Sequence, residues 1–259
     1  MMKIIVADPI YLPDAYRIWL EELGETEVFR TAPSSREDFR ERIKDAEIVI
    51  IGRYGFPKEA FLSAPRLKLI AIWQTGYDNV DIKAATEHGV VVSNVPSYSF
   101  DAVAEFVFVL ALNLLRRVHI ADARYRRGQL DCSCYVGKQL MGKTLGVIGT
   151  GDIGRRVIQI GHGFNMKVLS VTAHPSLEKE NELGLKFVDL DTLLSESDIL
   201  TLHLPLTPST ESMIGAREFA KMKRTAILIN TARGRIIDPA FRINAPIRNI
   251  FRKPARIDE

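Results

Sequence analysis

The stretch Leu145-Gly146-Val147-Ile148-Gly149-Thr150-Gly151-Asp152-Ile153-Gly154 decides the fold of this 259-residue chain. The apolar residues before the glycine cluster predict a strand, Thr144–Ile148, and those after it predict a helix, Ile153–Gly161. A G-x-G-x-x-G pattern is weak by itself, but between a strand and a helix it indicates a Rossmann-type dinucleotide-binding unit. A glycine-rich turn that binds nothing is the alternative.

Each position in the pattern has a physical reason. Gly149 permits a tight turn, Gly151 lets the backbone approach a pyrophosphate, and Gly154 lets helix and strand pack closely. The helix then begins at Asp152 and Ile153, where N–H groups and the positive end of the helix dipole favour phosphates. These five residues are therefore candidate cofactor-binding residues.

The position that would hold the adenosine ribose lacks its usual acid. An NAD site of this type places Asp or Glu at the end of the second strand, about 20 residues on. Thr172 stands there, and no carboxylate precedes Glu178. Thr172 remains a candidate cofactor-binding residue. NAD is the expected cofactor, and NADP stays open because a 2′-phosphate would meet no negative charge at Thr172.

Outward from this stretch, near-continuous apolar runs alternate with helical patterns, which is typical of α/β folds with parallel sheets. Residues 1–100 form a first unit and 101–238 a second. In the first unit we expect strands Ile4–Ala7, Glu27–Phe29, Ile48–Ile51, Leu67–Trp73 and Val90–Ser93, and helices Asp14–Leu23, Arg36–Lys44, Glu59–Leu62 and Ile82–His88. In the second we expect further strands Lys167–Val171, Leu185–Phe187, Ile199–Leu204 and Ala226–Asn230, with helices near Asp191–Glu196 and at Ala216–Met222.

The second unit begins with Asp101–Arg117, which reads as a long helix that is apolar almost all round. Asp101 is a plausible N-cap, and Arg116 and Arg117 suit the negative end of the helix dipole. A helix without a polar face must be buried on several sides. It is either a core helix or a connector that also packs in a subunit interface, and the second interpretation predicts a homodimer.

Charge and composition narrow the function classes. The net charge is +3, and residues 239–259 hold five basic and two acidic residues, which leaves 30 of each sign elsewhere. A neutral body argues against nucleic-acid binding. No stretch approaches the ~20 apolar residues of a membrane span, and the N-terminus lacks a secretory signal. The two cysteines, Cys132 and Cys134, fit a reducing cytosol and no metal site, so the protein is expected to be cytoplasmic.

With these residues in view, the chain resembles the D-2-hydroxyacid dehydrogenase family over about residues 3–238. Besides the glycine loop, the resemblance rests on four segments: Gln74–Asp81, Asn94-Val95-Pro96 running into Ala102–Glu105, His203–Thr207 and Asn230–Gly234. It implies a flavodoxin-like substrate domain and a small 2-hydroxy or 2-keto acid as substrate. It also implies a doubly wound Rossmann cofactor domain, which we expect to be incomplete at its C-terminal side here.

In the first unit, the resemblance implies that Thr75, Gly76 and Tyr77 bind the substrate carboxylate, with Thr75 also near the cofactor. Physically, this loop follows a strand end, where open α/β folds bind ligands. A simple turn is the alternative. Tyr77 and Tyr98 are the candidate specificity side chains.

In the second unit, the resemblance makes Arg233 the catalytic arginine that clamps the substrate carboxylate, a task that suits bidentate guanidinium geometry. A structural ion pair is the alternative. Further implied cofactor contacts are Leu204, Pro205, Thr210, Thr231 and Ala232. His203 is interpreted as structural rather than as an acid.

After Asp238 the sequence departs from the family pattern. The family continues through another strand and a Pro-His loop, whereas no histidine follows Arg233 here. Residues 239–259 read as an aberrant basic tail, so we expect a truncated or frameshifted chain and an exposed sheet edge at Ala226–Asn230, which Phe241 and the tail's other apolar residues could cover only in part. Two hypotheses follow: an NAD(P)-dependent dehydrogenase impaired by loss of its acid/base histidine and glutamate, or a catalytically dead nucleotide-binding protein with a regulatory or interaction role.

Overall fold

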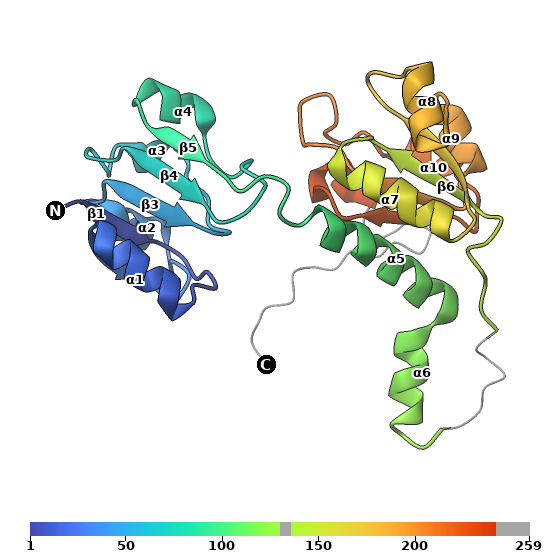
Figure 1. Ribbon diagram of the computed structural model, residues 1–259, viewed down its shortest axis with the longest axis horizontal. Coiled ribbons are helices and arrows are strands. Elements are labelled where there is room, and N and C mark those ends of the chain that lie inside the picture. Colours follow the sequence, from blue (N-terminus) through green and yellow to red (C-terminus); the bar gives the residue numbers. More distant parts are fainter. Residues whose placement is uncertain (130–135, 242–259) are drawn as a thin grey trace. The chain divides into compact units, whose positions relative to one another are not determined.

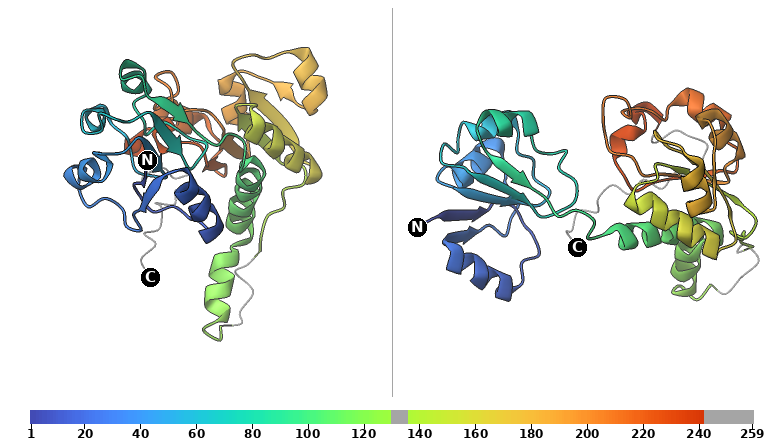
Figure 2. Two further views of the ribbon diagram at one scale, coloured as in Figure 1. Left: turned by 60° about the vertical axis from the view of Figure 1, so that its left-hand side comes forward. Right: turned by 45° about the horizontal axis from the view of Figure 1, so that its top comes forward.

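The computed structural model describes residues 1–129 and 136–241, which form two units, Met1–Tyr98 and Ser99–Glu259 (Figure 1). Each unit is a parallel sheet with helices (Figure 2). Cys132, Cys134 and most of the tail lie outside the described residues. Within them, no helix is both long and apolar enough to span a membrane.

Unit 1 carries a five-stranded sheet in the order β2-β1-β3-β4-β5, which is the flavodoxin-like order. The strands are β1 (Lys3–Val6), β2 (Glu25–Val28), β3 (Ile48–Ile51), β4 (Leu69–Ile72) and β5 (Val91–Ser93), and the helices are α1 (Asp14–Leu23), α2 (Arg36–Ile43), α3 (Lys58–Phe61) and α4 (Ile82–Glu87). The flavodoxin-like expectation is confirmed.

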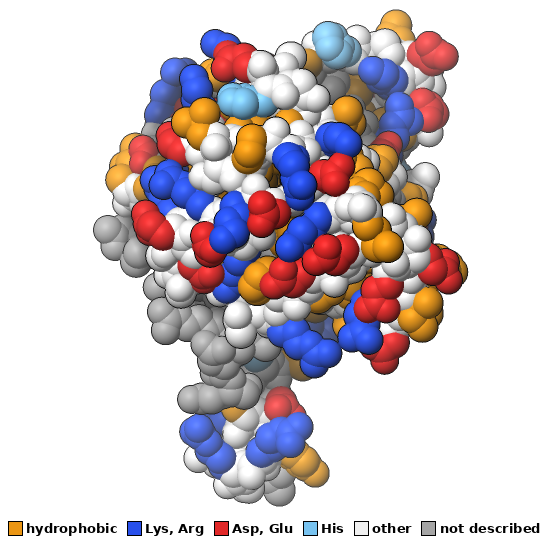
Figure 3. All heavy atoms as spheres, turned by 90° about the vertical axis from the view of Figure 1, so that its left-hand side faces the viewer, with side chains coloured by type: hydrophobic (Ala, Val, Ile, Leu, Met, Phe, Trp, Pro, Cys, Tyr) orange, Lys and Arg blue, Asp and Glu red, His pale blue; other side chains and the backbone are white. Residues whose placement is uncertain are grey.

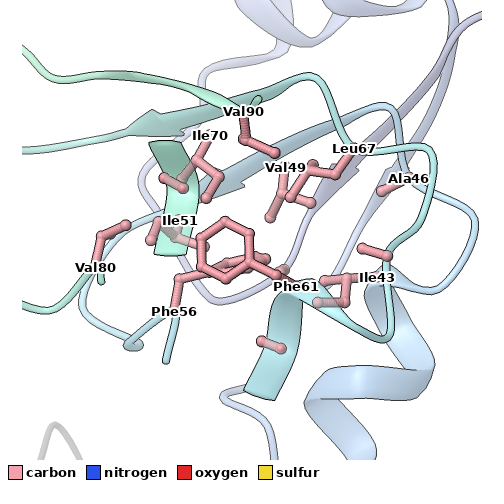
Figure 4. Close-up of a cluster of buried hydrophobic side chains, with 14 of the residues drawn as sticks. Ile43, Ala46, Val49, Ile51, Phe56, Phe61, Leu67, Ile70, Val80 and Val90 are labelled. Atoms are coloured by element: carbon pink, nitrogen blue, oxygen red, sulfur yellow. The ribbon is translucent and has the colours of Figure 1, made fainter. Parts of the chain in front are cut away.

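One face of this sheet packs on α2, α3 and α4. Figure 4 shows the cluster, in which the Phe56 ring stacks edge-on against Phe61 at 4.7 Å, with strand residues such as Val49 and Ile70 around them. Burying such side chains contributes roughly 1.5–3 kcal/mol each. The opposite face buries Ile4, Val6 and Ile50 more thinly, partly under Leu20 of α1.

Unit 2 carries a second parallel sheet in the order β10-β9-β6-β7-β8, the Rossmann order read from its other end. Its strands are β6 (Thr144–Ile148), β7 (Lys167–Val171), β8 (Lys186–Phe187), β9 (Ile199–Leu202) and β10 (Ile227–Asn230). Its helices are α5 (Phe100–Arg116), α6 (Val118–Tyr125), α7 (Asp152–Gly163), α8 (Leu177–Leu183), α9 (Leu190–Glu196) and α10 (Ala216–Lys221). Helices α5 and α7 cover one face, and α9 and α10 cover the other.

The strand order reverses at β6, since β7 and β8 are added on one side of it and β9 and β10 on the other, with all strands parallel. Open α/β sheets bind ligands at the carboxyl ends of the strands at such a switch point. In the described residues β10 is an edge strand, as the sequence predicted. Phe241, in a 3₁₀ turn at Pro239–Phe241, packs against Phe219 at 6.4 Å and so covers the α10 side.

The expectations for α5 were wrong in two respects. Ser99 is its N-cap residue, whereas Asp101 lies in the first turn and forms an ion pair with Arg156. The helix is also buried along one stripe only, at Ala104, Val107, Phe108 and Ala111, because only one side faces α7 and the sheet. Phe106 and Val109 are 42% and 55% exposed.

Two helices were not expected. Arg117 adopts a left-handed conformation (φ 53°) that ends α5, and α6 continues from it in a new direction (Figure 1). Helix α8 is polar and therefore lacks the apolar period, but Ser176 caps its N-terminus and Gly184 ends it at φ 62°. The other helices and strands lie within two residues of their expected bounds.

Charges are distributed evenly on the face shown in Figure 3, where Lys and Arg side chains are interspersed with Asp and Glu. Such a mixed surface has no large field of one sign.

Candidate functional site

The glycine loop between β6 and α7 is held by backbone contacts that leave no room for side chains at two positions. Gly149 has φ 96°, and a Cβ there would lie 2.5 Å from the His203 carbonyl oxygen. A Cβ on Gly154 would overlap the carbonyl oxygen of Gly149. Glycine at both positions therefore follows from the close approach of strand, loop and helix.

Gly151 differs, because a Cβ there would meet no atom within 4 Å. This residue is the N-cap of α7, with ordinary extended backbone (φ −72°), and Asp152 and Ile153 follow it in the first turn. The first N–H groups of a helix have no acceptor within the helix. Open space at this helix N-terminus is what a pyrophosphate needs, so the residues fit a dinucleotide.

A groove of about 660 Å³ lies beside the end of β7. Its lining residues are Thr172, Pro175, Ser176, Leu177, Glu180, Phe187, Val188, Asp189 and Thr192. The Thr172 hydroxyl accepts a hydrogen bond from Thr150 of the glycine loop at 3.2 Å, so the groove adjoins the loop. The lining holds two carboxylates and no lysine or arginine.

Both carboxylates have partners within the protein. Glu180 accepts from the Phe187 N–H at 2.7 Å. Asp189 caps α9, and hydrogen bonds from the backbone N–H and hydroxyl of Thr192 lower its pKa from the usual value.

Residues at the end of β10 form a tight turn. The Asn230 side chain donates to the Arg233 carbonyl oxygen at 2.8 Å and accepts from the Ala232 N–H at 3.0 Å. The Thr231 hydroxyl oxygen is buried and has no hydrogen-bond partner among the described residues. A buried polar atom of this kind needs an explanation, and a bound ligand is one.

The half-buried Arg233 guanidinium donates to the Ala232 carbonyl oxygen at 3.2 Å. At the end of β9, Leu204 and Pro205 follow His203. The Thr210 hydroxyl closes this loop by donating to the Pro205 carbonyl oxygen at 2.7 Å, which gives Thr210 a structural task.

His203 is largely buried, and its Nε2 lies 2.9 Å from the hydroxyl of buried Thr201. Burial lowers the pKa of His203 from 6.5 to about 4. The imidazole is therefore neutral near pH 7, which supports a structural role over an acid.

This lowered pKa predicts acid sensitivity. The unfolded chain binds a proton at His203 below pH 6.5, whereas the folded protein does so only near pH 4, so stability is lost as pH falls through this window. The loss amounts to about 3 kcal/mol. We expect urea unfolding between pH 7 and 4 to show it and His203→Gln to flatten the pH profile. His174→Gln, at an exposed position, is the control, and equal slopes for both variants would contradict the assignment.

In unit 1 the segment after β4 carries the candidate substrate residues. Asn94 donates to the Thr75 carbonyl oxygen at 2.7 Å, and Gln74 donates to the Gly76 carbonyl oxygen at 3.0 Å. The Thr75 hydroxyl donates to the Val95 carbonyl oxygen at 3.0 Å. The loop is thus fixed by side chains on both of its flanks, and Tyr77 is 54% exposed.

Tyr98, the other candidate specificity residue, is 64% exposed at the end of unit 1. The candidate residues of unit 2 all follow the carboxyl ends of β6, β7, β9 and β10, and Thr75, Gly76 and Tyr77 follow that of β4. The sequence had assigned no role to Asn230, Asn94 or Gln74, which position these loops. Among the described residues, no cluster of three or more His, Cys, Asp or Glu could hold a metal.

Comparisons with known proteins agree with this geometry. The family model described as "D-isomer specific 2-hydroxyacid dehydrogenase, NAD binding domain" matches residues 108–245. The chain is 39% identical to a D-3-phosphoglycerate dehydrogenase of Methanocaldococcus jannaschii over 92% of its own length and 45% of that protein's. It is 38% identical to a glyoxylate reductase of Korarchaeum cryptofilum over 85% of its own length and 68% of that protein's.

Solved structures give the same result. An acyclic imino acid reductase in complex with NADPH and D-Arg superposes with a TM-score of 0.84 at 31% identity, covering 97% of this chain and 84% of that one. The D-lactate dehydrogenase of Aquifex aeolicus, complexed with NAD and lactic acid, gives a TM-score of 0.80 at 33% identity, covering 91% and 70%. The chain thus spans from about half to most of the length of the proteins that it matches.

Proposed function

The chain belongs to the family of D-isomer-specific 2-hydroxyacid dehydrogenases, and from this premise we propose that unit 2 binds NAD at the glycine loop while unit 1 supplies the loop that binds a small 2-keto or 2-hydroxy acid. One observation carries the proposal. Gly151 faces open space at the N-terminus of α7, whereas glycines on both sides of it are sterically required. This is the arrangement that a pyrophosphate demands.

Two further features support the nucleotide. The buried Thr231 hydroxyl oxygen has no hydrogen-bond partner among the described residues, and a polar group of the nucleotide would supply one. The groove beside Thr172 would take the adenosine, and its lining offers two carboxylates but no cation to a 2′-phosphate. We therefore propose that NAD is preferred over NADP.

The bound nicotinamide would supply the hydride, and the protein residues would orient the acid. In unit 2 the Arg233 guanidinium would bind a carboxylate, and in unit 1 the backbone N–H groups around Gly76 would do the same. Proton transfer at neutral pH needs a group such as histidine. His203 does not suit this task because it is neutral and already placed against Thr201.

We propose accordingly that this 259-residue polypeptide binds cofactor well but turns substrate over slowly. Losing a general acid/base costs ~10²–10⁴ in rate. The alternative, a nucleotide-binding protein without catalytic activity, shares the binding step and differs only in turnover.

The test is to titrate the full chain with NADH and NADPH by fluorescence and to assay glyoxylate, pyruvate and hydroxypyruvate reduction. We expect NADH to bind more tightly than NADPH, with weak turnover that Arg233→Gln abolishes while leaving NADH affinity within about twofold. Absence of NADH binding by folded protein would refute the proposal. Binding with no turnover above Arg233→Gln would establish the non-catalytic alternative.

A homodimer through α5 is the second part of this proposal. Two large apolar side chains of α5, Phe106 and Val109, are exposed to solvent. On α6, the exposed large apolar side chains are Val118, Ile120 and Tyr125. Single exposed apolar residues are ordinary, but a continuous group marks an interaction surface.

If α5 forms the interface, Val109→Asp will dissociate the dimer, because the new carboxylate would be buried in the interface without a partner. Sedimentation velocity should show a shift from dimer to monomer at micromolar concentration. Leu62→Asp, at a position 77% exposed in unit 1, is the matched control and should leave the dimer intact. A monomeric wild-type chain would exclude this mode of association.

A further inference from the structure

Unit 1 contains a pocket of about 260 Å³ that none of the candidate cofactor or substrate residues lines. It lies between α2, α3 and the turn that follows β3. The residues that matter to its chemistry are Arg36, Phe39, Arg40, Tyr54, Ala60 and Asn79.

Two arginines line the pocket without a hydrogen-bonded partner among the described residues. Arg36 and Arg40 lie one turn apart on α2 and both interact electrostatically with the exposed Glu37, but among the described residues neither guanidinium forms a hydrogen bond or ion pair. Like charges at this spacing destabilise a helix. The neighbouring Arg42 shows the contrast, since it pairs with Asp38 at 2.9 Å. The guanidinium groups of Arg36 and Arg40 can thus both donate hydrogen bonds to an anion at this pocket.

Part of the pocket wall is apolar. The Phe39 and Tyr54 rings pack at 4.6 Å between centroids, and Phe39 and Ala60 are almost fully buried. Such a surface fits a flat or branched hydrocarbon body. An anion alone would leave this wall unused.

Asn79 supplies a third kind of group. Its Nδ2 donates to the Tyr54 carbonyl oxygen at 2.8 Å, but its Oδ1 is buried and has no hydrogen-bond partner among the described residues. Buried side-chain oxygens normally accept a hydrogen bond, so the Asn79 Oδ1 could accept one from a ligand. The pocket therefore combines two cationic donors, an apolar surface and an acceptor without a partner. A few polar groups placed around an apolar surface are typical of a ligand site.

We propose that this pocket binds a small organic acid with an apolar body and one hydroxyl or amino donor. The carboxylate pairs with Arg36 and Arg40, the apolar body packs on the half-buried Tyr54 ring, which Phe39 supports from below, and the donor satisfies Asn79. The site goes beyond the proposed function and does not depend on it, because it lies wholly within unit 1 and shares no residue with the nucleotide or substrate residues.

The pocket is nonetheless tied to the substrate loop. The Phe56 N–H donates to the Asn79 carbonyl oxygen at 2.8 Å, and the Asp81 N–H donates to the Phe56 carbonyl oxygen at 3.1 Å. Asn79 belongs to the segment that begins with Thr75. An occupant should therefore slow hydrogen exchange at Phe56 and Asp81.

Three probes separate the contributions: 4-hydroxyphenylacetate, phenylacetate, which lacks the hydroxyl donor, and 4-hydroxyphenethyl alcohol, which lacks the anion. Calorimetry on the full chain should show that 4-hydroxyphenylacetate binds most tightly and that each deletion weakens binding by about tenfold. The double variant Arg36→Gln/Arg40→Gln should weaken 4-hydroxyphenylacetate by about tenfold or more.

The matched control is Arg30→Gln/Lys83→Gln, which removes the same charge from exposed positions of unit 1 outside the pocket. It should leave affinity within about twofold. Binding should also persist with saturating glyoxylate and in Arg233→Gln, which separates this site from the substrate site and keeps the result independent of NADH binding. Equal weakening in both double variants, or no binding of 4-hydroxyphenylacetate by wild-type protein, would overturn the proposal.

Discussion

Gly154→Ala is expected to destabilise unit 2 by about 2–3 kcal/mol. The added Cβ would overlap the Gly149 carbonyl oxygen, which is backbone and cannot rotate away. Gly149 cannot retreat, because it already lies against the His203 carbonyl group. Both tryptophans, Trp19 and Trp73, lie in unit 1, so their fluorescence does not report the unfolding of unit 2. The loss of stability in unit 2 is therefore measured by urea unfolding monitored by circular dichroism.

Gly151→Ala is the matched control for that result. Its Cβ meets open space, so stability should change by no more than about 1 kcal/mol, the cost of a poorer N-cap. NADH affinity should nonetheless fall at least about tenfold, because the methyl group occupies the space that a pyrophosphate needs. Equal stability of the two variants would contradict the packing argument, and unchanged NADH affinity in Gly151→Ala would contradict the placement of the cofactor.

The second large effect concerns Asp8, at the end of β1. Its carboxylate is 3% exposed and accepts three backbone N–H groups, from Gly52 at 2.7 Å, Arg53 at 2.9 Å and Tyr54 at 3.0 Å. Asp8→Ala leaves three donors without their acceptor in a buried turn. Each such loss costs roughly 1–3 kcal/mol, so unit 1 should lose at least about 3 kcal/mol.

Tryptophan fluorescence during urea unfolding measures this loss directly, because Trp19 and Trp73 belong to unit 1. Asp8→Asn keeps one acceptor oxygen and should lose an intermediate amount. Asp45→Asn, at an exposed carboxylate, should stay within about 0.5 kcal/mol of wild type. An Asp8→Ala midpoint equal to that of Asp45→Asn would show that solvent satisfies the turn.

The sheets could be predicted from sequence because their strands are short apolar runs with clear ends. Bounds for β6 and β7 agreed with the sequence to the residue. Helix α8 has no apolar period, so periodicity does not predict it, although Ser176 and Gly184 carry the capping signals of a short helix. The bend at Arg117 had no such signal, since a left-handed arginine is uncommon.

The candidate site also combines features that the sequence predicts with features that only the fold reveals. The glycine spacing identified the loop, because close backbone approach excludes every other residue at Gly149 and Gly154. Asn230, Asn94 and Asp8 received no role, since what they do depends on contacts with loops that only the fold brings near. The orphaned oxygens of Thr231 and Asn79 are also invisible in a sequence, because burial decides whether a missing partner matters.

The order of strands along the chain has a consequence for synthesis on the ribosome. Every strand of the first sheet comes from residues 3–93, so its last pairing, between β4 and β5, can form before the glycine loop has been translated. The second sheet must wait longer, because its central strand β6 gains its first neighbour only at Lys167 and its other at Ile199. Domains generally fold as units from the N-terminus during translation. Unit 1 should thus reach its native structure as a nascent chain, with unit 2 still emerging.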